Sequence, residues 1–249
     1  MPSAKPPSRV VPATGRPVLI VAHGAPWVPC AQEAALAGLA DAVGRLLPDR
    51  LVRSATLACP GALEDAVQDL VDPIVFPLFM TDGFFVSTLL PRRLTSAGLA
   101  HWDVLTPLGL DPSLPEIALS HLRAELVVRD LSGPAATLVL AAHGSPSNPK
   151  PAQATYAFAR KLEESRLFGA LQVGFVDEKP SLEEAATVTG PALLLPFFAT
   201  RAGHVVIDLR EAVAAAGFKG TVLPPIGVWP EVRDLVAQAV LRYDLALVV

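Results

Sequence analysis

The second half of this chain repeats the first, and this duplication limits the possible folds more than any other feature of the sequence. Residues 21–26 read VAHGAP and residues 141–146 read AAHGSP, which places the two histidines 120 positions apart. Two further matches follow in the same order, FPLF at 76–79 with LPFF at 195–198, and PLG at 107–109 with PIG at 225–227. The sequence therefore predicts two similar units that face each other across a cleft.

Within each unit, short apolar runs alternate with segments of helical periodicity. We predict strands over 17–22, 51–57, 73–79, 102–108, 137–142, 171–176, 192–198 and 221–223. We predict helices over 31–47, 62–70, 86–97, 114–128, 153–167, 181–187, 204–216 and 231–243, with Pro91 marking a kink or a late start in the third.

Strands that alternate with helices form parallel sheets through right-handed crossovers. The predicted fold class is therefore α/β, with two duplicated units that each hold a parallel sheet flanked by helices. A linker at 131–134 divides an N-terminal half over 17–130 from a C-terminal half over 135–249. Residues 1–16 are rich in Pro and Ser without a continuous apolar core, so we expect a disordered tail rather than a secretory signal.

The composition excludes several classes of protein. A hydrophobic content of 51% can fill a sizeable core, and a net charge of −4 argues against general nucleic-acid binding. The longest stretch without a charged residue, 131–149, is broken by Gly and Pro and does not read as a membrane span. Cys30 and Cys59 are isolated and form no metal or redox motif, so a reducing cytoplasm is the expected compartment.

Two histidines of the second half mark the expected site. His143 ends one apolar run, and His204 follows the loop after another and opens a helix. The carboxyl edge of an open parallel sheet is where ligands bind, and two imidazoles that converge there suit a divalent transition metal. A helix N-terminus also favours the neutral, metal-binding form of His204.

The first half lacks most of these groups. It keeps His23, but Phe84 or Phe85 stands where the second half has His204. Its Leu57 and Ala58 lie opposite Asp177 and Glu178, so the acids are absent as well. A single working site would therefore belong to the second half, and His23 reads as a relic or a hydrogen-bonded loop residue. His101 and His121 have no partner motif and are expected at the surface.

The strand-His-Gly-Ser opening at His143, the strand-Pro-loop-Gly-His element ending at His204 and the duplicated layout resemble the class II chelatases, the CbiX-like family of sirohydrochlorin cobaltochelatases and ferrochelatases. The resemblance implies a chelatase-like fold in which His143 and His204 bind the incoming metal and act as the catalytic residues. Some members add a carboxylate from the loop after the second strand, and here either Asp177 or Glu178 is in that position.

The implied reaction is insertion of Co²⁺ or Fe²⁺ into sirohydrochlorin or a related tetrapyrrole, in cobalamin or siroheme biosynthesis. The metal, Co²⁺, Fe²⁺ or Ni²⁺, is then a substrate, and no cofactor is permanently bound. Two histidines and at most one carboxylate leave coordination positions open, as a transfer site requires.

The tetrapyrrole needs an apolar platform for its face and basic groups for its carboxylates. Phe84, Phe85, Phe197 and Phe198 are candidates for the platform, although phenylalanines are more often core residues. Lys150 and Arg201 are candidates for the rim, as are Arg92 and Arg93, and Ser145, Ser147 and Asn148 are candidate hydrogen-bond donors.

Two other functions share parts of this sequence pattern. The loss of ligands from the first half is also what a non-catalytic metal- or tetrapyrrole-binding paralogue would show. A hydrolase built on His-Gly-Ser is disfavoured because the Gly-x-Ser-x-Gly nucleophile elbow is missing. In the leading interpretation the partner is a small-molecule tetrapyrrole, with no nucleic acid or membrane, and the protein is a monomer or homodimer.

Overall fold

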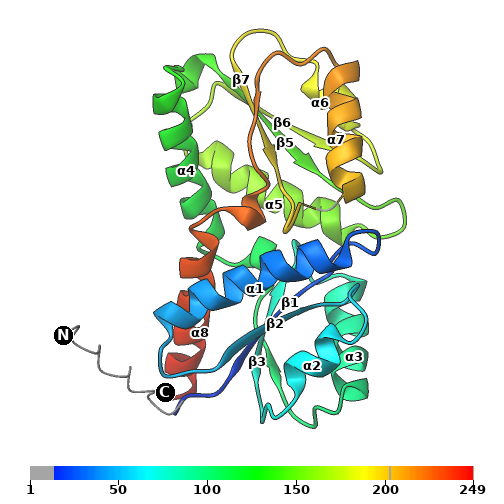
Figure 1. Ribbon diagram of the computed structural model, residues 1–249. Helices are drawn as coiled ribbons and strands as arrows, with labels where there is room; N and C mark the ends of the chain where they lie inside the picture. The colour runs from blue at the N-terminus through cyan, green and yellow to red at the C-terminus, as the bar shows by residue number, and fades with distance from the viewer. Residues whose placement is uncertain (1–13, 202, 249) are drawn as a thin grey trace, which may run out of the picture.

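The computed structural model describes residues 14–201 and 203–248, and the side chains of 203–206 fall outside that description. The N-terminal half contains β1 Val18–Ala22, α1 Pro29–Leu46, β2 Val52–Thr56, α2 Ala62–Val67, β3 Ile74–Leu78, α3 Leu90–Ser96, β4 Asp103–Val104 and α4 Leu114–Val128 (Figure 1). The C-terminal half contains β5 Thr137–Ala142, α5 Lys150–Glu164, β6 Ala170–Phe175, α6 Leu182–Ala186, β7 Ala192–Pro196, α7 Gly203–Ala215, β8 Thr221–Val222 and α8 Val232–Leu247.

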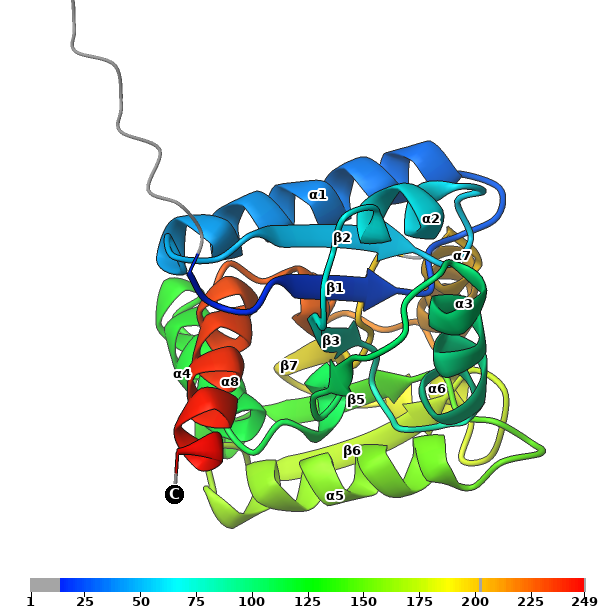
Figure 2. The same cartoon turned by 90° about the horizontal axis from the view of Figure 1, so that it is seen from below.

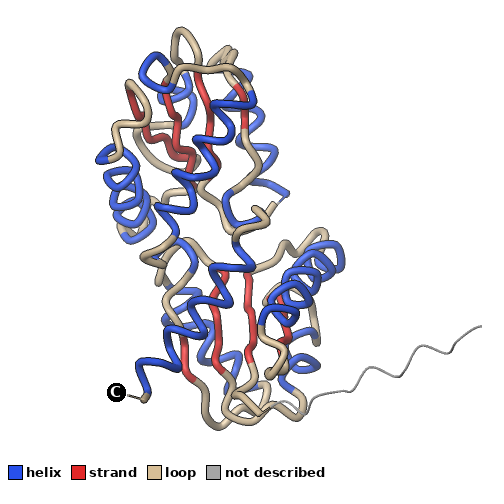
Figure 3. The backbone as a smooth tube through the Cα atoms, turned by 90° about the vertical axis from the view of Figure 1, so that its left-hand side faces the viewer, coloured by secondary structure: helices blue, strands red, loops and turns tan. Residues whose placement is uncertain are grey.

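The strands form two parallel four-stranded sheets with the same topology, β2-β1-β3-β4 and β6-β5-β7-β8. Figure 3 shows the two sheets as separate groups of strands, one in each half. Every residue of β1, β3 and β7 is buried, as expected for parallel strands covered by helices on both faces. The α/β fold class and the duplication predicted from the sequence are confirmed.

In both sheets the first strand of the half has the second strand on one side and the third strand on the other, so the strand order changes direction there. β1 lies between β2 and β3, and β5 lies between β6 and β7, so a crevice opens beyond the carboxyl ends of these strands. Figure 2 shows that the arrowheads of β1, β2, β5 and β6 point to the same end of the molecule, where α3, α6 and α7 also lie. The loops that follow the strands of both halves therefore meet at one end.

The last helix of each half packs against the other half. α4 contacts α5, and α8 runs back along α1 beside the first sheet (Figure 1). One hydrophobic cluster consequently joins side chains of both halves, among them Leu36 and Phe76 with Leu193 and Leu235. The boundary at 131–134 stays a prediction. The helix that precedes it, α4, packs on the second half, and the last helix of the second half, α8, packs on the first.

Several elements differ in detail from the prediction. β4 and β8 are two residues long, and the residues after each turn into 3-10 helix at Leu108–Leu110 and Ile226–Val228. A π-helical turn, Phe85–Leu89, runs directly into α3, and Pro91 is the second residue of α3. Arg16, which we placed in the tail, forms ion pairs with Asp72 and Asp103. Residues 1–13 of that tail lie outside the described residues.

The prediction that His121 lies at the surface is wrong. Its ring stacks on the Trp229 indole with the centroids 3.9 Å apart, and its side chain is only 17% exposed. Glu231 contacts its Nδ1 at 3.1 Å. His121 belongs to α4, and Trp229 and Glu231 precede α8, so these two contacts arise from the exchange of helices and have no local sequence signal.

Candidate functional site

His143 and Asp177 form an ion-pairing contact at the carboxyl end of the second sheet. His143 directly follows β5 and Asp177 follows β6, with 2.9 Å between His143 Nδ1 and Asp177 Oδ2. The pairing of the two strands continues past their ends, because the backbone N–H of Asp177 donates to the carbonyl of His143. Both side chains are a little over 40% exposed, so the pair is open to a ligand.

Glu178 has a different role from its neighbour. Its Oε1 accepts a hydrogen bond of 3.0 Å from the backbone N–H of Ser145. The carboxylate lies against Gly144, whose φ of +74° is in the left-handed region, and a Cβ at Gly144 would stand 2.6 Å from that same oxygen. Glu178 therefore braces the turn after His143, whereas Asp177 contacts the imidazole itself.

His204 belongs to α7, which begins at Gly203 after the loop that follows β7. Its side chain lies outside the described residues, so the meeting of His143 and His204 remains a prediction. Among the side chains that are described, no group of three or more His, Cys, Asp and Glu residues could hold a metal ion. His143 and Asp177 are the described part of the predicted ligand set.

The first half carries an aromatic contact at the corresponding place. The His23 ring packs against Phe85, with centroids 4.3 Å apart, and its Nδ1 lies 3.0 Å from the carbonyl of Gly24. Phe79 and Phe198 accept equivalent backbone hydrogen bonds from Gly109 and Gly227, and the offset of 119 between them also pairs Phe85 with His204. Of the two phenylalanines that the sequence left open, Phe85 is thus the counterpart of His204.

The predicted aromatic platform is only half accessible. Phe84 and Phe85 are exposed, whereas Phe197 and Phe198 are buried. Phe197 stacks on Phe158 of α5 with centroids 4.6 Å apart, so it is a core residue and cannot contact a ring in the cleft. The suggestion that Phe197 and Phe198 line the substrate site is therefore wrong.

The predicted basic and polar groups differ in what already engages them. Lys150 pairs with Asp82 at 3.0 Å, and Arg93 contacts Glu64 and the carbonyl of Leu57. Ser145 lies 3.5 Å from Ser147, hydroxyl to hydroxyl, and Asn148 accepts from the backbone N–H of Lys150. In the described part of the chain, no ion pair engages the exposed guanidinium of Arg201.

Arg201 also lines a groove of about 730 Å³ between the two halves. One wall is the apolar face of α1, and the other is formed by the loop after β7 and the turn before α8. Sequence reasoning found Arg201 but missed Gln32, Thr200, Trp229 and Arg233, which line the same groove. Gln32, Trp229 and Arg233 lie outside the motifs that located the site, and Thr200 lies in the loop before His204.

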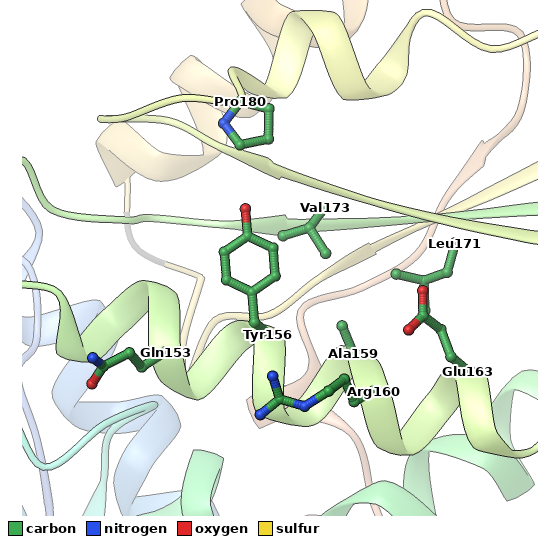
Figure 4. A pocket seen from close by; sticks show the side chains of 8 residues that line it. All are labelled: Gln153, Tyr156, Ala159, Arg160, Glu163, Leu171, Val173 and Pro180. Atoms are coloured by element: carbon green, nitrogen blue, oxygen red, sulfur yellow. The ribbon is translucent and has the colours of Figure 1, made fainter.

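A second cavity, of about 500 Å³, lies between α5 and the edge strand β6 (Figure 4). Tyr156 stands in it between α5 and Pro180, and its ring also contacts Phe175. The lining includes neither His143 nor Asp177. Its lining comes from α5, β6 and Pro180 alone, whereas the groove between the halves is also lined by the loop that leads from β7 to His204.

Known proteins share this architecture. The CbiX family profile matches residues 137–243, which lie in the half that holds His143 and Asp177. The structure of CbiX from denitrifying bacteria, described as the terminal enzyme for the biosynthesis of siroheme, is 40% identical with a TM-score of 0.83. That alignment covers 90% of this chain and 98% of the other.

Two more distant relatives agree in fold or name. SirB from Bacillus subtilis, solved with Fe³⁺, has a TM-score of 0.71 at 18% identity over 90% of this chain and 94% of its own, a likeness of fold alone. A probable sirohydrochlorin cobaltochelatase from Halobacterium salinarum is 25% identical over 162 residues. That match spans 55% of each chain, or about half the length of the curated relative.

The duplicated α/β halves, with a histidine at the end of the first strand of each, define a class II chelatase. Within that class the chain belongs to the CbiX family, as the resemblance in sequence implied.

Proposed function

We propose that this protein inserts a divalent metal, Co²⁺ or Fe²⁺, into sirohydrochlorin or a related tetrapyrrole, for cobalamin or siroheme biosynthesis. The observation that carries the proposal is the contact between His143 and Asp177 at the carboxyl end of β5, in the half that the family profile matches. Cobalt, iron or nickel is the second substrate in this reaction rather than a resident cofactor.

The contact gives His143 a defined chemical role. A carboxylate at Nδ1 accepts a hydrogen bond from the Nδ1–H, so the proton stays on Nδ1 and the neutral tautomer has its lone pair on Nε2. Nε2 of a histidine can bind a metal ion or accept a proton displaced from a pyrrole. The tautomer is inferred from the partner, because hydrogen positions follow from the hydrogen-bond network. Asp177 thus orients the ligand, and His204 supplies the second imidazole.

The groove between the halves is the proposed site of the macrocycle. Its apolar α1 wall suits a ring face, and Arg201 and Arg233 suit the carboxylates at the rim of sirohydrochlorin. Phe84 and Phe85, the candidates for an aromatic platform, are exposed. Lys150 is a weaker candidate because it already pairs with Asp82.

Three accompanying features belong to the proposal as well: a cytoplasmic location, a monomer or homodimer, and a partnership confined to small molecules. No helix in the described ranges is long and apolar enough to span a bilayer.

The proposal is tested by mixing the purified protein with sirohydrochlorin and Co²⁺ and following the absorbance change against the uncatalysed reaction. We expect acceleration by the wild type, loss of acceleration in His143→Ala and His204→Ala, and near wild-type rates in His23→Ala. His23 serves as the matched control because it follows β1 as His143 follows β5. Tetrapyrrole binding without acceleration by any of Co²⁺, Fe²⁺ and Ni²⁺ would instead identify a carrier, and equal loss in all three variants would refute a site in the second half.

A further inference from the structure

Two side chains bridge the halves in equivalent ways. Lys150, at the start of α5, donates through Nζ to the carbonyl of Asp82 at 3.4 Å and to its carboxylate at 3.0 Å. Gln32, in the first turn of α1, donates through Nε2 to the carbonyl of Arg201 at 2.7 Å. Asp82 and Arg201 are themselves counterparts, since the offset of 119 that pairs Phe79 with Phe198 also relates them. Each bridge thus runs from the first helix of one half to the loop after the third strand of the other.

The two bridges differ in what they leave available. The Asp82 carboxylate forms an ion pair with the ammonium of Lys150, so the two charges of that bridge neutralise each other. Gln32 engages only the backbone of Arg201, and in the described residues no acid pairs with the guanidinium. The second bridge therefore fixes a loop while leaving its cation free for a ligand, at the wall of the groove.

Burying the amide of Gln32 costs free energy that a purely structural contact would not recover. It is 9% exposed, and its Oε1 is buried without a partner among the described residues. The amide orientation follows from the carbonyl of Arg201, which can only accept, so Nε2 must face it and Oε1 must face away. One neutral hydrogen bond contributes no more than an orphaned buried acceptor costs. The amide therefore adds little net stability, and groups that break a local rule in this way occur at functional sites.

We propose that Gln32 is a positioning residue that holds Arg201 in the groove wall for contact with substrate carboxylates. The inference rests on the proposed function and extends it to a residue of the non-catalytic half. It assigns the first half a part in substrate recognition even though that half has lost its own metal ligands.

The test uses Gln32→Met, which keeps the length of the side chain and removes both polar atoms. We expect the dissociation constant of metal-free sirohydrochlorin, measured by absorbance titration, to rise about fivefold. We expect kcat to stay near the wild-type value and the melting temperature not to fall, because the orphaned acceptor is gone. A fall in melting temperature with an unchanged dissociation constant would overturn the proposal.

A double-mutant cycle separates positioning from direct binding. Arg201→Ala alone should weaken sirohydrochlorin binding by about tenfold or more, as for loss of a charge-assisted hydrogen bond. If Gln32 acts through Arg201, then Gln32→Met in the Arg201→Ala background should change binding by less than about twofold. Independent, multiplying effects of the two substitutions would contradict a positioning role.

Gln153 provides the matched control. It is the fourth residue of α5 as Gln32 is of α1, it follows an alanine in the same way, and it is exposed at the cavity of Figure 4. Gln153→Met should leave both binding and turnover unchanged, and an effect equal to that of Gln32→Met would count against the proposal.

A readout without ligand keeps the two proposals separate. Backbone hydrogen exchange in a peptide containing residues 199–201 should be faster in Gln32→Met than in the wild type or Gln153→Met. If the wild type fails to bind sirohydrochlorin, the proposed function falls, and unchanged exchange in this peptide would by itself refute the role of Gln32.

Discussion

At the scale of single residues, two adjacent acids divide two tasks. Asp177 contacts the imidazole of His143, and Glu178 turns away to hold the backbone of Ser145. The family resemblance implied an acid from this loop, where the first half has Leu57 and Ala58. It left the choice between the two open, because neighbouring side chains on an irregular loop have no period that assigns their direction.

This division predicts different results for two conservative substitutions. Asp177→Asn keeps the size of the side chain but removes the charge that fixes the proton on Nδ1 of His143. Loss of such an outer partner lowers metal affinity or activity by about 10- to 100-fold, so kcat/KM should fall by that factor. Glu178→Gln retains a side-chain oxygen that can accept the hydrogen bond from the Ser145 N–H. Its kcat/KM should therefore stay within about twofold of the wild-type value. Initial rates with Co²⁺ and sirohydrochlorin measure both, and a larger loss in Glu178→Gln would reverse the assignment.

At the scale of secondary-structure elements, α6 fixes the loop that carries both acids. Ser181 caps the helix, its hydroxyl accepting from the N–H of Glu184 while the Glu184 carboxylate accepts from the N–H of Ser181. The pairing with Lys179, followed by these bonds, lowers the pKa of Glu184 to about 2 from its ordinary 4.5. The capping box thus anchors the segment just after Glu178.

The pKa of Glu184 predicts how this anchor responds to acid. A lowered pKa in the folded state means that the ionised carboxylate contributes stability above pH 4.5, and that the contribution is lost as the pH falls through about 2. Glu184 is exposed, so solvent screening keeps the effect local. Hydrogen exchange of residues 182–186 should therefore be faster in Glu184→Gln than in the wild type at pH 7. The protection factors should converge towards pH 2, and a difference that grows with acidity would contradict this assignment.

The same scale shows which elements the sequence could predict. Helices with a strong apolar period were placed well, and α4 matches its predicted range of 114–128. The lengths of β4 and β8 were predicted too long, β4 by more than β8. Each strand pairs with one neighbour over only two residues, and a proline two or three positions later ends the extended segment. Apolar periodicity identifies the buried face of a helix but not the element that covers it, so the exchange of α4 and α8 had no sequence signal.

At the scale of the whole molecule, α8 ties the end of the chain to the first half through polar contacts as well as the shared core. Arg242 donates to the buried carboxylate of Asp111 at 2.6 Å, and Asp244 pairs with Arg50. Hydrogen bonds from the Tyr243 hydroxyl and from Arg16 lower the pKa of Asp103 in β4. The groove between the halves therefore has walls whose separation is set by α8, since Arg233 lies in the groove at the start of the same helix.

This arrangement predicts that the two halves unfold together. Because one hydrophobic cluster contains side chains of both halves, differential scanning calorimetry should show a single transition with equal calorimetric and van't Hoff enthalpies.

Arg242→Met should lower the free energy of unfolding by about 1–3 kcal/mol, because the buried Asp111 carboxylate loses a partner and keeps only its bonds from Ser113. The transition should shift by roughly 2–4 °C per kcal/mol without splitting. Arg129→Met, which removes only a pair within α4, should cost less than about 0.5 kcal/mol. Two separate transitions in the wild type would show that each half is a stable unit, and the groove would then be a surface between independent domains.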